Sequence, residues 1–121
     1  MQQEKQTQEI ELGRKNYFIR IPKLNGLKYE KDIIKTWSFK KRSEDKISAV
    51  YFLFNDDKLI YVGQTIQLYA RLNIHHKHIN FTHYSYIPIK DMFRRQLTEC
   101  YYIKKLKPPL NQQYSLRGWI R

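Results

Sequence analysis

The sequence predicts a small α+β domain whose elements follow the order strand, strand, helix, strand, helix. Two short apolar runs flank the polar residues 55–57, and this pattern is typical of a tight β-hairpin. After Gly63, apolar residues recur at helical spacing, which indicates a first helix. A second amphipathic stretch starts near Asp91 and stops at the two prolines 108–109.

The hairpin is the clearest of these elements. Residues 49–54 (AVYFLF) predict its first strand and residues 58–62 (KLIYV) its second. We expect Gly63 to end the second strand and Thr65 to cap the helix that follows. In that helix, one face is predicted to carry Leu68, Leu72 and either His75 or His76.

The remaining elements follow from weaker patterns. Residues 83–90 (HYSYIPIK) alternate weakly and contain Pro88, which favours an edge strand. Asp91 is a plausible N-cap for the last helix. Its apolar stripe is predicted to consist of Phe93, Leu97, Cys100 and Ile103.

Residues 1–48 predict a basic, partly flexible N-terminal extension to a domain of residues 49–121. The extension carries 12 basic and 7 acidic residues with little periodic apolar pattern. Within it, residues 29–37 favour a short helix.

Composition narrows the class of protein. A chain of 121 residues can bury one small core, which excludes a large multidomain enzyme. The net charge of +12 predicts attraction to polyanions, and it favours nucleic acid over a membrane surface as the partner. The single Cys100 excludes an internal disulfide and a cysteine-based zinc site. The polar N-terminus and the lack of a long apolar run favour a cytoplasmic protein without a membrane span.

Glu99 is the only acidic residue after Met92, where seven residues are basic. The simpler interpretation is an ion pair with Arg95, four residues earlier, and composition alone favours it. The alternative is a ligand for a divalent cation. A carboxylate on a rigid element among phosphate-binding side chains suits metal-assisted phosphodiester cleavage.

Arg71 and His75 lie four residues apart, so both can point from one helix toward the same site. A solvated basic face is the simpler interpretation. In the functional one, Arg71 binds a phosphate oxygen and His75 handles a proton near neutral pH. Tyr51 and Tyr61, one in each hairpin strand, can project from neighbouring positions on one face.

Taken together, these residues resemble the GIY-YIG nuclease family over about residues 49–112. The two motifs stand here as residues 49–51 (AVY) and 61–63 (YVG), with glutamine and threonine following the second. Ala49 replaces the glycine that gives the first motif its name. Arg71 matches the helix arginine of the family, and His75 matches the histidine of its restriction-enzyme-like members. Glu99 matches the metal-binding glutamate, and Asn111 matches the closing asparagine.

The resemblance implies a three-stranded antiparallel sheet flanked by helices and hydrolysis of DNA phosphodiester bonds with Mg²⁺ or Mn²⁺. The catalytic residues that it implies are Tyr51, Tyr61, Arg71, His75, Glu99 and Asn111. Glu99 would hold the metal, Arg71 would stabilise charge on the phosphate, and Asn111 would support Glu99 or its loop. The sequence leaves open which tyrosine is the base.

We expect basic side chains outside the site and the N-terminal extension to provide most of the binding to DNA. The candidates are Lys40, Lys41, Arg42, Lys77, Arg94, Lys104 and Lys105. One site per chain predicts nicking, or cleavage of single-stranded or branched DNA, by a monomer. The alternatives are a restriction-type homodimer and a non-catalytic nucleic-acid-binding module. The resemblance implies a stand-alone enzyme of the sort found in phages, mobile elements and bacterial repair or restriction.

Overall fold

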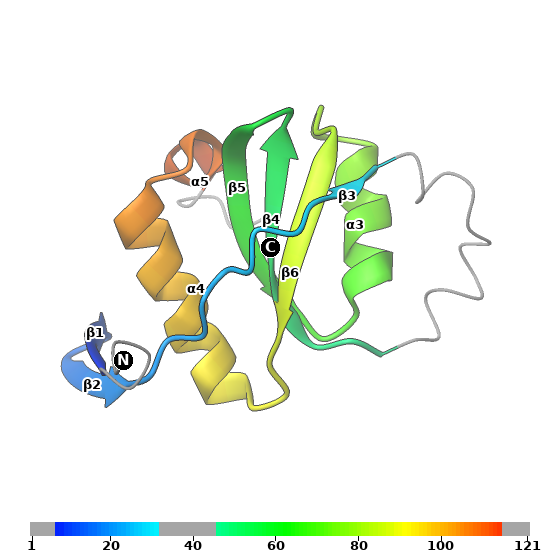
Figure 1. The fold of residues 1–121 in the computed structure, drawn as a ribbon. Coiled ribbons are helices and arrows are strands. Elements are labelled where there is room, and N and C mark those ends of the chain that lie inside the picture. Colours follow the sequence, from blue (N-terminus) through cyan, green and yellow to red (C-terminus); the bar gives the residue numbers. More distant parts are fainter. Residues whose placement is uncertain (1–6, 32–45, 115–121) are drawn as a thin grey trace.

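The computed structural model describes residues 7–31 and 46–114 and shows an α+β fold (Figure 1). A four-stranded antiparallel sheet, in the order β3-β6-β4-β5, forms its centre, and β1 and β2 form a separate antiparallel hairpin. The elements are β1 (Gln8–Leu12), β2 (Lys15–Ile19), β3 (Tyr29–Glu30), β4 (Ala49–Asn55), β5 (Lys58–Thr65), α3 (Leu68–His76), β6 (His83–Pro88), α4 (Met92–Leu106) and α5 (Pro109–Tyr114).

The central sheet has four strands where three were predicted. The additional strand is β3, which comes from the segment where the sequence favoured a short helix. Tyr29 pairs with Tyr84 of β6, and the two rings lie 5.3 Å apart between centroids. A strand of two residues is too short to show alternation, so the sequence pattern could not reveal it. The rest of the predicted helix, from residue 32 on, lies outside the described residues.

Pairing with β3 makes β6 an interior strand, and the predicted edge position is therefore wrong. Pro88 is tolerated because β3 pairs only with the first two residues of β6. The amide of Ile89 donates to the carbonyl oxygen of Ser48, on the β4 side. The nitrogen of Pro88 therefore points the other way, past the end of β3, where no ladder hydrogen bond is lost.

The predicted hairpin is confirmed as β4 and β5, with a turn in which Asp56 adopts a φ of 55°. The second strand does not end at Gly63 but continues to Thr65. Thr65 is not the N-cap of α3, because Gln67 occupies that position. Instead the Thr65 hydroxyl accepts a hydrogen bond from the Gln67 amide at 3.0 Å, which turns the chain into the helix.

The sheet separates two apolar clusters because successive side chains of β4 point to opposite faces. Tyr51 and Leu53 pack with α3, whereas Val50 and Phe52 pack on the face that receives Tyr102 of α4. The five side chains are buried. Because β4 is buried on both faces, its sequence is a continuous apolar run and does not alternate between apolar and polar residues.

The face opposite α3 is also covered by residues 20–28, which cross the front of the sheet in Figure 1. Ile21 and Leu24 pack against the second cluster. The Tyr102 hydroxyl donates to the carbonyl oxygen of Pro22 at 2.7 Å and accepts from the amide of Leu24 at 3.1 Å. The segment between the N-terminal hairpin and β3 is thereby fixed to α4.

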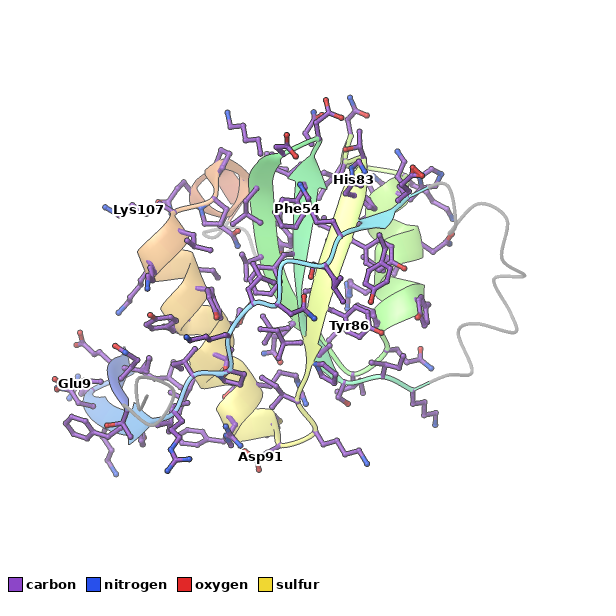
Figure 2. All side chains as sticks on the ribbon, viewed as in Figure 1. Glu9, Phe54, His83, Tyr86, Asp91 and Lys107 are labelled. Atoms are coloured by element: carbon purple, nitrogen blue, oxygen red, sulfur yellow. The ribbon has the colours of Figure 1, made fainter. Side chains whose placement is uncertain are left out.

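Asp91 caps α4 as predicted, since its carboxylate accepts a hydrogen bond from the Arg94 amide at 2.8 Å. The helix ends at Leu106, and its C-cap residue, Lys107, has a φ of 47°, in the left-handed region. Figure 2 labels Asp91 and Lys107 at the ends of α4. A further helix, α5, begins at Pro109 and was not predicted. Within the described ranges, no helix has the length and apolar character needed to cross a bilayer.

Candidate active site

Tyr51 and His75 form the central contact of the site. Tyr51 points from β4 toward α3, and His75 lies in the last turn of that helix. The Tyr51 hydroxyl lies 2.5 Å from Nε2 of His75, within hydrogen-bond distance, and both residues are buried. His75 shares the buried face of α3 with Leu68 and Leu72. The apolar spacing that predicted the helix therefore also directs the imidazole toward the sheet.

Tyr61 joins this pair from β5. Its ring centroid lies 5.2 Å from that of His75 and 6.1 Å from that of Tyr51. In the β4–β5 register, Tyr61 pairs with Leu53 and Tyr51 pairs with Gly63, so the two tyrosines are diagonal neighbours on one face. We call Tyr51, Tyr61 and His75 the aromatic cluster.

The imidazole of His75 is held in its neutral form. Its pKa is lowered from 6.5 to about 3, mainly because burial disfavours the charged ring; the charges of Arg71 and His78 act in the same direction. Arg71 precedes His75 by one turn of α3. The sequence suggested proton handling near neutral pH, whereas the resting imidazole of the fold accepts a proton only in acid.

This lowered pKa predicts a loss of stability in acid. Unfolded His75 binds a proton below about pH 6.5 while the folded protein resists it, so stability falls as the pH drops. Between about pH 8 and about pH 5, His75 alone should cost about 2 kcal/mol of unfolding free energy. Denaturant titrations at both pH values measure this cost.

His75→Gln should remove about 2 kcal/mol of that pH dependence. His83→Gln, which changes a histidine outside the aromatic cluster, is the matched control and should preserve it. An undiminished acid loss in His75→Gln would show that other groups cause it.

Gly63 lets the Tyr51 ring lie directly on β5. A Cβ atom at position 63 would fall 2.5 Å from the Tyr51 hydroxyl oxygen and 2.6 Å from the ring carbon that bears it. Such distances are far inside van der Waals contact. The Tyr51 ring has no room to retreat, because it is fully buried and its hydroxyl contacts His75.

Gly63→Ala should therefore displace Tyr51, cost about 1–3 kcal/mol of stability and weaken any activity that depends on its hydroxyl. Unfolding free energies in a double-mutant cycle with Tyr51→Leu test this, because the smaller side chain relieves the clash. We expect the double variant to be more stable than the sum of the single effects. Strict additivity would mean that the two positions do not compete for space.

Glu99 lies on α4, the helix that packs against β5. The Glu99 residue is only 3% exposed. It borders a pocket of about 260 Å³ that is also lined by Lys104. One turn earlier, the guanidinium of Arg95 donates to the side chain of Gln64 at 2.8 Å and to the carbonyl oxygens of Ile89 and Lys90. Among the described residues, the Arg95–Glu99 ion pair is therefore not formed.

The predicted residues thus come from two sides of the sheet. The aromatic cluster and Arg71 lie on the face of α3, and Glu99 belongs to the helix on the opposite face. The strand β5 links them, because it carries Tyr61 and contacts α4. Gln64, which holds α4 through Arg95, directly follows the glycine beneath Tyr51.

Asn111 attaches α5 to the outer edge of β5. Its side-chain oxygen accepts a hydrogen bond from the Val62 amide, and its side-chain nitrogen donates to the Val62 carbonyl oxygen, both at 2.8 Å. Asn111 is 4% exposed. Its contacts therefore fix the strand residue next to Gly63 and do not involve Glu99.

The predicted DNA contacts are dispersed. Lys77, Arg94, Lys104 and Lys105 are exposed at the end of α3 and along α4. Lys104 and Lys105 line a groove of about 590 Å³ between α4 and β1. The remaining predicted contacts, Lys40, Lys41 and Arg42, lie outside the described residues.

Two residues that position the site were missed by the sequence reasoning. Gly63 was interpreted only as a strand end, although its place in the second motif was a usable signal. Arg95 was considered only as a partner for Glu99. Nothing in the sequence separates this buried arginine from the exposed Arg94 beside it.

The fold and these residues define a small α+β domain in which two tyrosines and a histidine meet on one sheet face, one helical turn from Arg71. A family model of the GIY-YIG catalytic domain matches residues 47–109, just over half of the chain, and the chain belongs to this family. Membership implies a nuclease that acts on nucleic acid. No curated protein and no solved structure matches the chain.

Proposed function

We propose that the protein is a Mg²⁺- or Mn²⁺-dependent DNA endonuclease that hydrolyses phosphodiester bonds. The observation that carries the proposal is the hydrogen-bonded Tyr51–His75 pair beside Tyr61, inside a GIY-YIG catalytic domain. A hydroxyl held by a neutral imidazole can exchange a proton in either direction. General acid–base chemistry needs this property at the attacking water.

In this proposal, Tyr51 is the base. Its oxygen takes a proton from the attacking water while its own proton moves toward Nε2 of His75. The low pKa of His75 restricts its protonated form to a transient state. Tyr61 positions the phosphate or the water, and Arg71 stabilises negative charge on the phosphoryl oxygens.

Glu99 is the proposed metal ligand, and a single carboxylate of this kind suits Mg²⁺. Among the described residues, no group of three or more carboxylate, histidine or cysteine side chains gathers at one point. Mg²⁺ commonly binds through one carboxylate, with waters and substrate phosphates as its other ligands. When bound, the metal supplies charge stabilisation for the leaving 3′-oxygen.

The remaining residues support binding and geometry. Asn111 holds β5 in place beside Gly63 and is a positioning residue. The exposed lysines and arginines are proposed to contact the DNA backbone. With one site per chain, a monomer would nick duplex DNA or cut single-stranded or branched DNA, and a homodimer would be needed to cut both strands at once.

A cleavage assay tests the proposal. Supercoiled plasmid and single-stranded DNA are incubated with the protein and Mg²⁺ or Mn²⁺, and the expected result is nicked or shortened product that EDTA abolishes. Arg71→Ala should cut far less than wild type. A protein that binds DNA well but is inert with every divalent metal would instead be a non-catalytic binding module.

A further inference from the structure

The β1–β2 hairpin is fixed against α4 by contacts from both of its strands. Ile10 of β1 is 3% exposed, and β1 packs against α4. Tyr17 of β2 packs edge-on against Phe93 of α4, with ring centroids 4.8 Å apart. In Figure 1, the hairpin lies on the side of α4 away from the sheet. The hairpin therefore holds its side chains at a defined place beside the helix that carries Glu99.

The strand register assigns the residues of the hairpin to two faces. Ile10 pairs with Tyr17 and Leu12 pairs with Lys15, and residues paired directly opposite each other point to the same face. Because Ile10 and Tyr17 face α4, Leu12 and Lys15, two residues further along each strand, face it as well. The acidic side chains of β1 point to the other face. Within the two strands, Lys15 is therefore the only charged residue on the face toward α4.

This face of the hairpin reaches the pocket of about 260 Å³ that Glu99 borders. Leu12 lines the pocket together with Glu99, Cys100 and Lys104. The Cβ atom of Lys15 is about 5 Å from that of Leu12, the separation of directly paired residues. Its flexible four-carbon stem is long enough to carry the ammonium group from there to the mouth of the pocket. Two ammonium groups, one from the hairpin and one from α4, are therefore within reach of one buried carboxylate.

Lys15 and Lys104 are exposed and available to an anion. Within residues 7–31 and 46–114, no acidic side chain forms an ion pair with either lysine. Lys104 also borders the larger groove that Glu9 and Glu11 line, but neither carboxylate lies within ion-pair distance of it. The excess of positive charge at the pocket of Glu99 therefore favours a negatively charged ligand.

We propose that Lys15 and Lys104 bind a backbone phosphate of the DNA strand at the pocket of Glu99. The proposal rests on the nuclease function and identifies the part of the hairpin that holds the substrate. Lysine binds phosphate as a point charge on a flexible stem, which suits a backbone contact that carries no sequence information. The hairpin is thereby part of the substrate-binding surface, next to the residue proposed to hold the metal.

Fluorescence anisotropy in EDTA measures this contact without cleavage. A labelled single-stranded oligonucleotide is titrated with wild type, Lys15→Ala, Lys15→Arg and Lys58→Ala. Lys15→Ala should weaken binding about 5-fold and lower the slope of log affinity against log salt by about 0.7. Lys15→Arg keeps the charge and should bind like wild type. Lys58→Ala is the matched control, because it removes an exposed lysine at the start of β5, and it should also bind like wild type.

Cys100 locates the bound strand. It is the only cysteine of the chain, and it lines the pocket of Glu99. The rate at which iodoacetamide alkylates its thiol is followed by mass spectrometry. The oligonucleotide should slow this reaction several-fold in wild type and in Lys58→Ala. At the same DNA concentration, the protection should be largely lost in the double variant Lys15→Ala/Lys104→Ala.

Two results would overturn the inference. One is a folded Lys15→Ala that keeps the affinity and the salt slope of wild type. The other is a wild type in which bound DNA leaves the alkylation of Cys100 unchanged, because the strand would then lie elsewhere. A lower free energy of unfolding with an unchanged salt slope would assign Lys15 a purely structural role.

These readouts do not depend on cleavage. Wild type that shows the predicted binding and protection but cuts no DNA would contradict only the nuclease proposal. Cleavage by wild type, together with unaltered binding by Lys15→Ala, would contradict only this inference.

Discussion

Glu99→Gln is expected to reduce the rate of DNA cleavage by about 1000-fold, because it removes the carboxylate proposed to hold the metal. The substitution keeps the size of a side chain that is 3% exposed, so the fold should tolerate it. Single-turnover cleavage with saturating protein measures the chemical step. DNA affinity in EDTA should change little, since no metal is bound under that condition.

Gln96→Ala is the matched control for Glu99. Gln96 lies on the same helix and lines the same pocket, but its side chain carries no charge. Its cleavage rate should stay within a few-fold of wild type. If Glu99→Gln cut at the rate of the control, the metal would have to be held elsewhere and the role proposed for Glu99 would be wrong.

Tyr51→Phe should lower the cleavage rate by about 100-fold or more, the range expected for loss of a general base. Only the hydroxyl that contacts Nε2 of His75 is removed, and the ring that packs on Gly63 stays. The loss should appear in kcat, with DNA affinity nearly unchanged. Cleavage rates measured across a range of pH follow the proton transfer directly.

Two further tyrosines make this experiment decisive. Tyr84→Phe alters a buried tyrosine on the same sheet face and should cut normally. Tyr61→Phe addresses the choice that the sequence left open. If Tyr61→Phe lost activity and Tyr51→Phe retained it, the base would be Tyr61, and the contact with His75 would have a structural role.

The fold was predictable where local sequence determines conformation. The β4–β5 hairpin and the Asp91 cap follow from a polar turn and from a side chain that can bond the first turn of a helix. The strand β3 was not predictable, because two residues form it only when β6 is available for pairing. Its edge contact also decides that β6 is an interior strand.

The surroundings of the predicted site residues were only partly predictable. Spacing placed either His75 or His76 on the buried face of α3, and the buried residue is His75. The buried face of α4 differs from the predicted apolar stripe. Phe93 is 41% exposed, and Arg95, Thr98 and Glu99 are buried instead. Polar groups can be buried when distant partners satisfy them, as Gln64 does for Arg95. Local pattern carries no information about partners more than 30 residues away.

The amide of Asn111 has a consequence for how this chain behaves in a crowded solution. An open sheet edge offers unpaired amides and carbonyls to other molecules and so invites intermolecular strand addition and aggregation. Asn111 occupies both backbone groups of Val62 on one edge, and the opposite edge strand, β3, has only two residues. A side chain that holds β5 in place thus also shields the sheet from growth into a larger assembly.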